Sequence, residues 1–254
     1  REEFQIREPD VRLGKKTDVD SLFQACKWLL GLIPIIVSRK RVREQVFSAS
    51  SGICLIHGDT PSTLVGALLA KRAGLQIAHL ESGLRSESFL HPFPEEIIRV
   101  IVMKLSDVLF APDEKAVLNL VALKVKGRIE ETTTNTGIES LEENIEEVNP
   151  ASGPVIATLH RVENLHRKKR LKGFLKLLEQ ITQKGQQVLF VLHQPTQEIL
   201  HKQGLLKKIE EMGIKIAPLM PYKEFIKKLA SAPYVIIDGG SIQEETAHMG
   251  IPCL

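Results

Sequence analysis

The fold of this chain is decided by Ile53-Cys54-Leu55-Ile56-His57-Gly58-Asp59-Thr60-Pro61 and by the similar stretch Gln76-Ile77-Ala78-His79-Leu80-Glu81-Ser82-Gly83-Leu84-Arg85. Each stretch contains a short apolar run that ends in glycine, histidine and a carboxylate, a pattern typical of a strand with a charged tip. The residues between them have a helical pattern, with Thr60 suited to cap the helix and Pro61 suited to its first position. The two stretches therefore predict a βαβ unit.

The carboxylates at these strand tips are expected to lie close together. A right-handed crossover makes the two strands parallel, so both carboxyl ends lie at one edge of the sheet, and ligands of open α/β sheets bind at that edge. Asp59 and Glu81 should point towards one crevice, and Glu95, in a Pro-rich loop leading to a helix, can reach it. Three carboxylates taken at random would mean nothing, but carboxylates that share a cleft can divide acid and base roles between them.

Strand and helix patterns alternate along the rest of the chain. Further strands are expected at 107–110, 129–133, 155–159, 187–192, 214–217 and 234–237. Further helices are expected at 18–48, where Pro34 should break or kink the helix so that two helices form, and from Pro94 onwards. Others are expected at 112–123, 168–183, 196–212 and 221–231, and from 241. The Pro-, Gly- and Ser-rich run 149–154 is the expected linker. We therefore predict an α/β architecture of two Rossmann-like doubly wound domains, 1–149 and 150–254, that face a cleft.

The composition argues against nucleic acid and membrane partners. The net charge is only +3 and aromatic residues make up 5% of the 254 residues. The basic run at 167–172 fits a solvated helix face better than a polyanion site, and base-stacking platforms have no support. The longest apolar run, 29–37, is too short to cross a bilayer.

The cysteines and histidines do not predict a metal site. Cys26, Cys54 and Cys253 lack the spacing of metal ligands and cannot all pair, so we interpret them as reduced core thiols in a cytoplasmic protein. His57 and His79 precede carboxylates, but packing or hydrogen bonding at a strand end is favoured over metal binding. No cofactor is predicted.

A second group of candidate residues follows strands of the second domain. His160 and Arg161 follow the strand at 155–159 and would suit a pyrophosphate clamp, although a structural histidine is the alternative. His193, at the next strand tip, is a weaker candidate for lining a nucleotide cleft.

The turn Asp238-Gly239-Gly240-Ser241 precedes a helix. Ser241 and Glu244 fit a capping box, and a well-capped helix is one interpretation of this turn. The other is that Gly239 and Gly240 let a phosphate approach backbone N–H groups, with Glu245 accepting hydrogen bonds from ribose.

Five motifs in this order closely resemble the non-hydrolysing UDP-N-acetylglucosamine 2-epimerase family, nearly from end to end. They are HGDTPSTLVGALLA, AHLESGLRS, PFPEEIIR, TLHRVEN and DGGSIQEE. The resemblance implies the GT-B fold, a UDP-sugar substrate and a homodimer. Members have a further βα unit before the position of residue 1 and a further stretch after 254, so the chain is expected to be a fragment truncated at both termini.

The resemblance also implies roles for individual residues. The family's catalytic carboxylates match Asp59, Glu81 and Glu95, its active-site histidine matches His160, and its ribose-binding glutamate matches Glu245. One departure is Gly239-Gly240-Ser241, where the family usually has Ser-Gly-Gly, which displaces a hydroxyl that would contact phosphate. Arg85 has two open roles, contact with phosphate and a structural salt bridge.

The implied activity is interconversion of UDP-GlcNAc and UDP-ManNAc by anti elimination of UDP and re-addition, supplying precursor for a cell-surface polysaccharide. Three alternatives stay open: a hydrolysing relative, a glycosyltransferase of the same fold, and a UDP-sugar-binding fragment without catalysis. The three carboxylates favour the epimerase, because a transferase has no need to keep all of them at the donor sugar.

Overall fold

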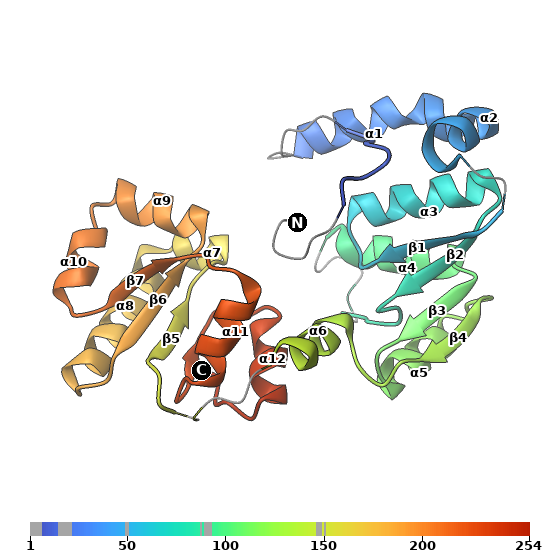
Figure 1. Ribbon diagram of the computed structural model, residues 1–254. Helices are drawn as coiled ribbons and strands as arrows, with labels where there is room; N and C mark the ends of the chain where they lie inside the picture. The colour runs from blue at the N-terminus through green and yellow to red at the C-terminus, as the bar shows by residue number, and fades with distance from the viewer. Residues whose placement is uncertain are drawn as a thin grey trace. The chain divides into compact units, whose positions relative to one another are not determined.

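Strands and helices alternate in two α/β units, Arg1–Asn135 and Thr136–Leu254 (Figure 1). The computed structural model describes residues 7–14, 22–48, 51–86, 88, 93–145, 149 and 151–254. Each unit contains a four-stranded sheet in which all described pairings are parallel. The predicted α/β class with parallel sheets is therefore confirmed.

The first unit carries its strands in sequential order, β1-β2-β3-β4. Its strands are β1 (Ile53–His57), β2 (Gln76–Leu80), β3 (Val108–Ala111) and β4 (Arg128–Glu131). Its helices are α1 (Leu22–Val37), α2 (Arg39–Val42), the π-helix η1 (Arg43–Phe47), α3 (Pro61–Ala73), α4 (Glu95–Leu105) and α5 (Glu114–Ala122). Sequential order with right-handed crossovers places α3, α4 and α5 on one face of the sheet.

The opening βαβ unit forms as the sequence predicts. The hydroxyl of Thr60 accepts a hydrogen bond from the N–H of Thr63, Pro61 is the first residue of α3, and Gly74 ends the helix with a φ of 83°. Val65 and Leu69 of this helix are almost fully buried against the sheet. The other face of β1 is different, because Ile53 and Leu55 are 64% and 61% exposed.

The second unit has the strand order β7-β6-β5-β8. Its strands are β5 (Val155–Thr158), β6 (Val188–Leu192), β7 (Lys215–Pro218) and β8 (Val235–Ile236). Its helices are α6 (Thr136–Asn144), α7 (Val162–Leu165), α8 (Lys168–Gln183), α9 (Gln194–Lys202), α10 (Leu206–Glu211), α11 (Tyr222–Ala230) and α12 (Ile242–His248). The order of connection reverses between β5 and β8, which is the topological switch point where ligands of such sheets bind.

Both faces of the second sheet are covered. Val155 and Ala157 of β5 pack in a core with Leu171, Leu175 and Leu178 of α8. Ile156, which points to the opposite face, packs in a second core with residues of α6 and α11. This unit is therefore doubly wound.

The unit boundary and two helices differ from the sequence-based expectation. The units divide between Asn135 and Thr136 rather than at 149–154, because Leu141 of α6 is buried in the core of the second unit. Pro34 lies inside α1 without breaking it, since the neighbouring Leu32 and Ile35 hold this last turn against the core. The helix expected at 196–212 is interrupted at Gly204, which has a φ of 65°.

Two further sequence-based expectations concern the cysteines and the membrane. Cys54 is half-buried but Cys253 is exposed, so the latter is not a core thiol; the side chain of Cys26 lies outside the described residues. Among the described residues, no helix has the length and apolar character needed to span a bilayer.

Gly83, which follows the tip of β2, provides a test of the local packing. A Cβ there would lie 2.4 Å from the carbonyl oxygen of Ala116, and Gly83 has a φ of 94°. Gly83→Ala is therefore expected to lower the free energy of unfolding by about 2–4 kcal/mol, since backbone must move and the residue is strained. The matched control is Gly173→Ala in α8, where no atom lies within 4 Å; it should stabilise by about 0.5–1 kcal/mol. Urea unfolding of both variants measures the difference, and equal effects would contradict this packing.

Candidate functional site

The carboxyl edge of the first sheet brings together two predicted carboxylates. His57 pairs in register with Leu80, so Asp59 and Glu81 follow adjacent strand ends. Glu81 itself has a φ of 54°, in the left-handed region, which a non-glycine residue occupies at a cost and which is common at functional sites. Oε2 of Glu81 lies 3.3 Å from Nε2 of His57.

His79 lies beneath this edge and interacts with the groups around it. Its Nε2 donates to the carbonyl of Gly58 at 3.0 Å, and its Nδ1 accepts from the hydroxyl of Ser82 at 3.1 Å. Burial lowers the pKa of His79, with a smaller contribution of the same sign from His57, while Asp59 and Glu81 act in the opposite direction. A neutral histidine with both nitrogens engaged is a structural group, as the sequence suggested.

Asp59 is held by an arginine from α4. Its Oδ2 accepts a hydrogen bond from Nε of Arg99 at 2.7 Å and lies 2.6 Å from Nη2 of the same arginine. The same guanidinium reaches Oε2 of Glu96 through Nη1 at 3.4 Å. This two-atom contact fixes where the Asp59 carboxylate points.

Glu96 is fully buried and accepts hydrogen bonds on both oxygens. Arg85 donates through Nε to Oε1, and the N–H of Ser86 donates to Oε2 at 3.1 Å. Burial alone would raise the pKa of Glu96, but these bonds outweigh it and the pKa lies below its ordinary value. The ion pair gives Arg85 a structural role, while its contact with a phosphate stays a prediction.

Glu95 is the first residue of α4, next to Glu96. Its Oε2 is buried and has no hydrogen-bond partner among the residues that the structure describes. An unpaired buried carboxylate oxygen is costly and calls for a functional explanation. Pro92, which begins the PFPEEIIR motif, lies outside the described residues.

The corresponding edge of the second sheet is organised by Asp238, which follows β8. Its carboxylate accepts from the N–H of His160 at 3.1 and 3.2 Å, from the N–H of Arg161 at 2.8 Å and from the side chain of Asn164 at 3.1 Å. Nδ1 of His160 lies 3.0 Å from Oδ1 of Asp238. Burial would raise the pKa of Asp238, yet the hydrogen bonds from Arg161, Asn164 and His160 lower it.

The depressed pKa of Asp238 predicts a pH dependence of stability. Its folded pKa lies below the unfolded value, so its contribution is complete above about pH 4 and is lost as pH falls through the folded pKa. Asp238→Asn should lower the free energy of unfolding by about 2–3 kcal/mol at pH 7. Urea unfolding of both proteins from pH 7 to pH 3 should show that the difference between their free energies of unfolding becomes smaller below pH 4. A difference in free energy of unfolding that grows on acidification would contradict this assignment.

The Gly-rich turn after Asp238 allows two side chains to approach it. A Cβ at Gly239 would lie 2.6 Å from Nη2 of Arg161, and one at Gly240 would lie 3.7 Å from ring atoms of His160. Both glycines have positive φ values, 117° and 104°. The predicted capping box is wrong, because Ser241 has helical dihedrals and its side chain makes no capping hydrogen bond. Its hydroxyl is therefore not used to cap α12.

Glu245 and His193 complete this group. Glu245 is 6% exposed, and Oε1 accepts from the hydroxyl of Tyr222 at 3.2 Å. Burial raises the pKa of Glu245, and burial together with that carboxylate raises the pKa of Tyr222 to about 12. The ring of His193 lies 5.1 Å from that of His160, and burial followed by the charge of His160 lowers the pKa of His193.

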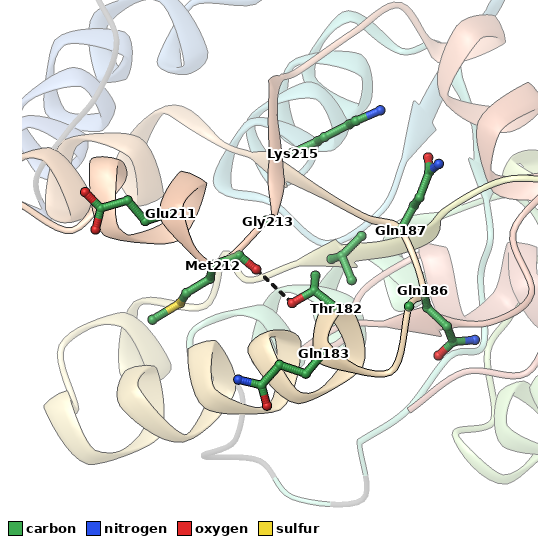
Figure 2. Close-up of a pocket in the computed structure, with 10 residues that line it drawn as sticks. Thr182, Gln183, Gln186, Gln187, Glu211, Met212, Gly213 and Lys215 are labelled. Atoms are coloured by element: carbon green, nitrogen blue, oxygen red, sulfur yellow. Dashed lines mark hydrogen bonds between the residues drawn. The ribbon is translucent and has the colours of Figure 1, made fainter.

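The cavity in Figure 2 lies at the other edge of the second sheet. It has a volume of about 380 Å³ and is lined by Thr182, Val188 at the start of β6, and Lys215 at the start of β7, among others. The hydroxyl of Thr182 donates to the carbonyl of Met212 across it at 2.8 Å (Figure 2). None of the predicted site residues lines this cavity. The candidate site is therefore identified by the charged side chains at the strand ends and not by a large cavity.

Sequence reasoning missed four residues that position the predicted ones. They are Glu96, Arg99, Tyr222 and Asp238. Asp238 follows a strand at the ligand-binding edge and Arg99 lies one turn after Glu95, so both carried a positional signal. Within the described residues, no group of three potential ligands is arranged to bind a metal ion.

The chain is similar in sequence to curated proteins of known activity. The UDP-N-acetylglucosamine 2-epimerase of Methanocaldococcus jannaschii is 32% identical over 228 residues, covering 84% of this chain and 62% of that protein. The UDP-2,3-diacetamido-2,3-dideoxy-D-glucuronate 2-epimerase of Pseudomonas aeruginosa is 33% identical over 209 residues, covering 79% of this chain and 57% of that protein. The chain thus spans about three fifths of these curated relatives.

A solved structure and a family model extend the comparison over the whole chain. The crystal structure of M. jannaschii UDP-GlcNAc 2-epimerase in complex with UDP-GlcNAc and UDP matches with a TM-score of 0.73 at 28% identity, covering 99% of this chain and 70% of that one. The fold is thus the α/β fold of GT-B-type proteins. A model described as UDP-N-acetylglucosamine 2-epimerase matches residues 1–254. The chain belongs to the UDP-N-acetylglucosamine 2-epimerase family.

Proposed function

We propose that this protein interconverts UDP-GlcNAc and UDP-ManNAc without net hydrolysis. The observation that carries the proposal is that Asp59 and Glu81 follow adjacent strand ends, and that Asp59 is held by Arg99, which lies one turn after Glu95. Among the described residues, a buried oxygen of Glu95 has no hydrogen-bond partner. Groups of this kind suit proton transfer on both faces of a sugar carbon. The reaction takes place in the cytoplasm and supplies an activated amino sugar for a cell-surface polysaccharide.

The proposed reaction has two stages. A carboxylate removes the proton from C2 while the bond between C1 and the UDP oxygen breaks, which leaves a glycal with a double bond between C1 and C2. A second carboxyl group, acting as an acid, returns a proton to C2 from the opposite face, and UDP adds again at C1. Asp59, Glu81 and Glu95 share the acid and base roles, since the first stage needs a base at C2 and the second needs an acid on the opposite face.

The departing UDP carries the negative charge that must be stabilised. We assign this task to His160 and Arg161, which Asp238 orients through their backbone N–H groups. Because Gly239 and Gly240 lack a Cβ atom, a diphosphate can approach the backbone N–H groups near these side chains. The crystal structure of a relative with UDP-GlcNAc and UDP bound supports a UDP-sugar ligand.

Glu245 is assigned to the ribose of UDP. The Tyr222 hydroxyl occupies Oε1 of Glu245, so Oε2 would accept from a ribose hydroxyl. A buried carboxylate fixed by a second side chain is preorganised for this contact. His193, stacked at a tilt against His160, would line the same nucleotide site.

Deuterium incorporation tests the proposed chemistry. The complete protein is incubated with UDP-GlcNAc in deuterated water, and the sugar is followed by NMR. Removal and return of the C2 proton must place deuterium at C2 of both epimers. A UDP-ManNAc product that keeps its original hydrogen would exclude this mechanism.

The same incubation separates the alternatives. Free ManNAc would identify a hydrolysing relative, and sugar transferred to an added acceptor would identify a glycosyltransferase. Calorimetric binding of UDP without any turnover would identify a UDP-sugar-binding protein that has no catalysis.

A further inference from the structure

Glu96 is the point at which the three carboxylate-bearing segments of the first unit are joined. Its side chain is 0% exposed. Arg85 and Ser86, which bond to it, follow Glu81 along the chain. Glu96 directly follows Glu95, and it contacts the arginine that holds Asp59.

Arg99 completes the connection to Asp59. Its Nε and Nη2 both face Oδ2 of Asp59, while Nη1 faces Oε2 of Glu96. The guanidinium therefore has one edge on each carboxylate, which only a planar group with several fixed donors can do. In the described part of the chain, no hydrogen bond to Oδ1 of Asp59 is present beside the contacts of Oδ2 with Arg99.

We propose that Glu96 is a positioning residue, which acts through Arg99 and Arg85 to hold Asp59, Glu81 and Glu95 in one reactive geometry. The inference rests on the proposed function, because it assumes that these three carboxylates move protons. Because Glu96 is fully buried, we assign it this positioning role and not direct contact with substrate.

A purely structural salt bridge explains the arrangement less well. Buried ion pairs contribute little net stability, and well-packed apolar side chains often replace them without loss. Here the buried charge orients an arginine whose other edge holds a candidate catalytic group 40 residues away. A misplacement of about 1 Å at a reacting group can cost about a hundredfold in rate, so orientation is the property that this network would protect.

Three variants test the proposal in the complete protein. Glu96→Gln keeps the shape of the side chain but replaces the carboxylate with an amide, whose NH₂ group cannot accept a hydrogen bond. The donors of Arg85, Ser86 and Arg99, which face the carboxylate in the native protein, therefore lose an acceptor. We expect kcat to fall about tenfold to a hundredfold while KM for UDP-GlcNAc changes less than about threefold. Arg99→Lys should cause a smaller loss than Arg99→Ala, because a lysine keeps the charge but not the two-sided contact.

The matched control is Glu114→Gln, which removes an exposed carboxylate from the first turn of α5 and should leave kcat unchanged. Millimolar guanidinium should partly restore the kcat of Arg99→Ala, a recovery that a loss of folding alone would not allow. Thermal melting of each variant shows the temperature range in which it is folded, and kcat is compared only there.

Two outcomes would overturn the inference. One is wild-type kcat in folded Glu96→Gln. The other, which stands even where Glu96→Gln fails to fold, is an Arg99→Ala variant with wild-type kcat or with no response to guanidinium. Wild-type protein that places no deuterium at C2 would instead refute the proposed function, so the two failures are distinguishable.

Discussion

Asp59→Asn is expected to lower kcat for UDP-GlcNAc epimerisation by about 10³-fold, within the range that a positioned acid or base contributes. The amide has nearly the same shape and can still accept from Arg99, whose Nε lies 2.7 Å from Oδ2 in the native protein. It cannot take up a proton at neutral pH. The measurement is steady-state turnover by NMR, with UDP affinity determined by calorimetry.

The UDP affinity of Asp59→Asn should stay within about threefold of the native value, because the diphosphate contacts are assigned to other side chains. A suitable control is Asp107→Asn at the opposite end of the same sheet. Asp107 accepts the N–H of Ile77 at 2.9 Å, which an asparagine oxygen can also do, so its kcat should not change. A kcat for Asp59→Asn within tenfold of wild type would remove Asp59 from the acid and base roles.

Gly239→Ala is expected to weaken UDP binding by about tenfold to a hundredfold, the equivalent of one charge-assisted hydrogen bond. The new Cβ would lie 2.6 Å from Nη2 of Arg161. Since this atom is the end of a flexible side chain, the guanidinium moves away and the backbone stays. Calorimetry with UDP measures the loss.

Gly250→Ala separates this displacement from backbone strain. Gly250 also has a positive φ, 70°, but no atom lies within 4 Å of a Cβ built there. Both variants should lose stability, whereas only Gly239→Ala should lose UDP affinity. In an Arg161→Ala background, Gly239→Ala should cost no further affinity; additive losses would show that Arg161 does not act through this contact.

Local signals made much of the fold predictable from the sequence. Thr60, Pro61 and Gly74 mark the two ends of α3, and no tertiary contact is needed to interpret them. The carboxyl edges of parallel strands then follow from handedness, which is how Asp59 and Glu81 could be placed together before any coordinates. The capping box at Ser241 failed because a sequence signature does not fix the dihedrals of the capping residue.

Other parts of the site depend on contacts that no local pattern encodes. Arg99 reaches Asp59 across 40 residues, and the backbone N–H of His160 reaches Asp238 across 78. Glu96 fits the first turn of a helix, where a carboxylate is expected on electrostatic grounds alone. Its burial depends on α4 lying against the segment that carries Arg85 and Ser86, which is a tertiary property.

The outward face of β1 has a practical consequence for handling this chain. In the sheet that the structure describes, β1 is an edge strand, and its side chains Ile53 and Leu55 are exposed. An exposed apolar strand at the edge of a sheet is a template to which another strand can add. Leu55→Lys is therefore expected to reduce self-association of this chain at high concentration.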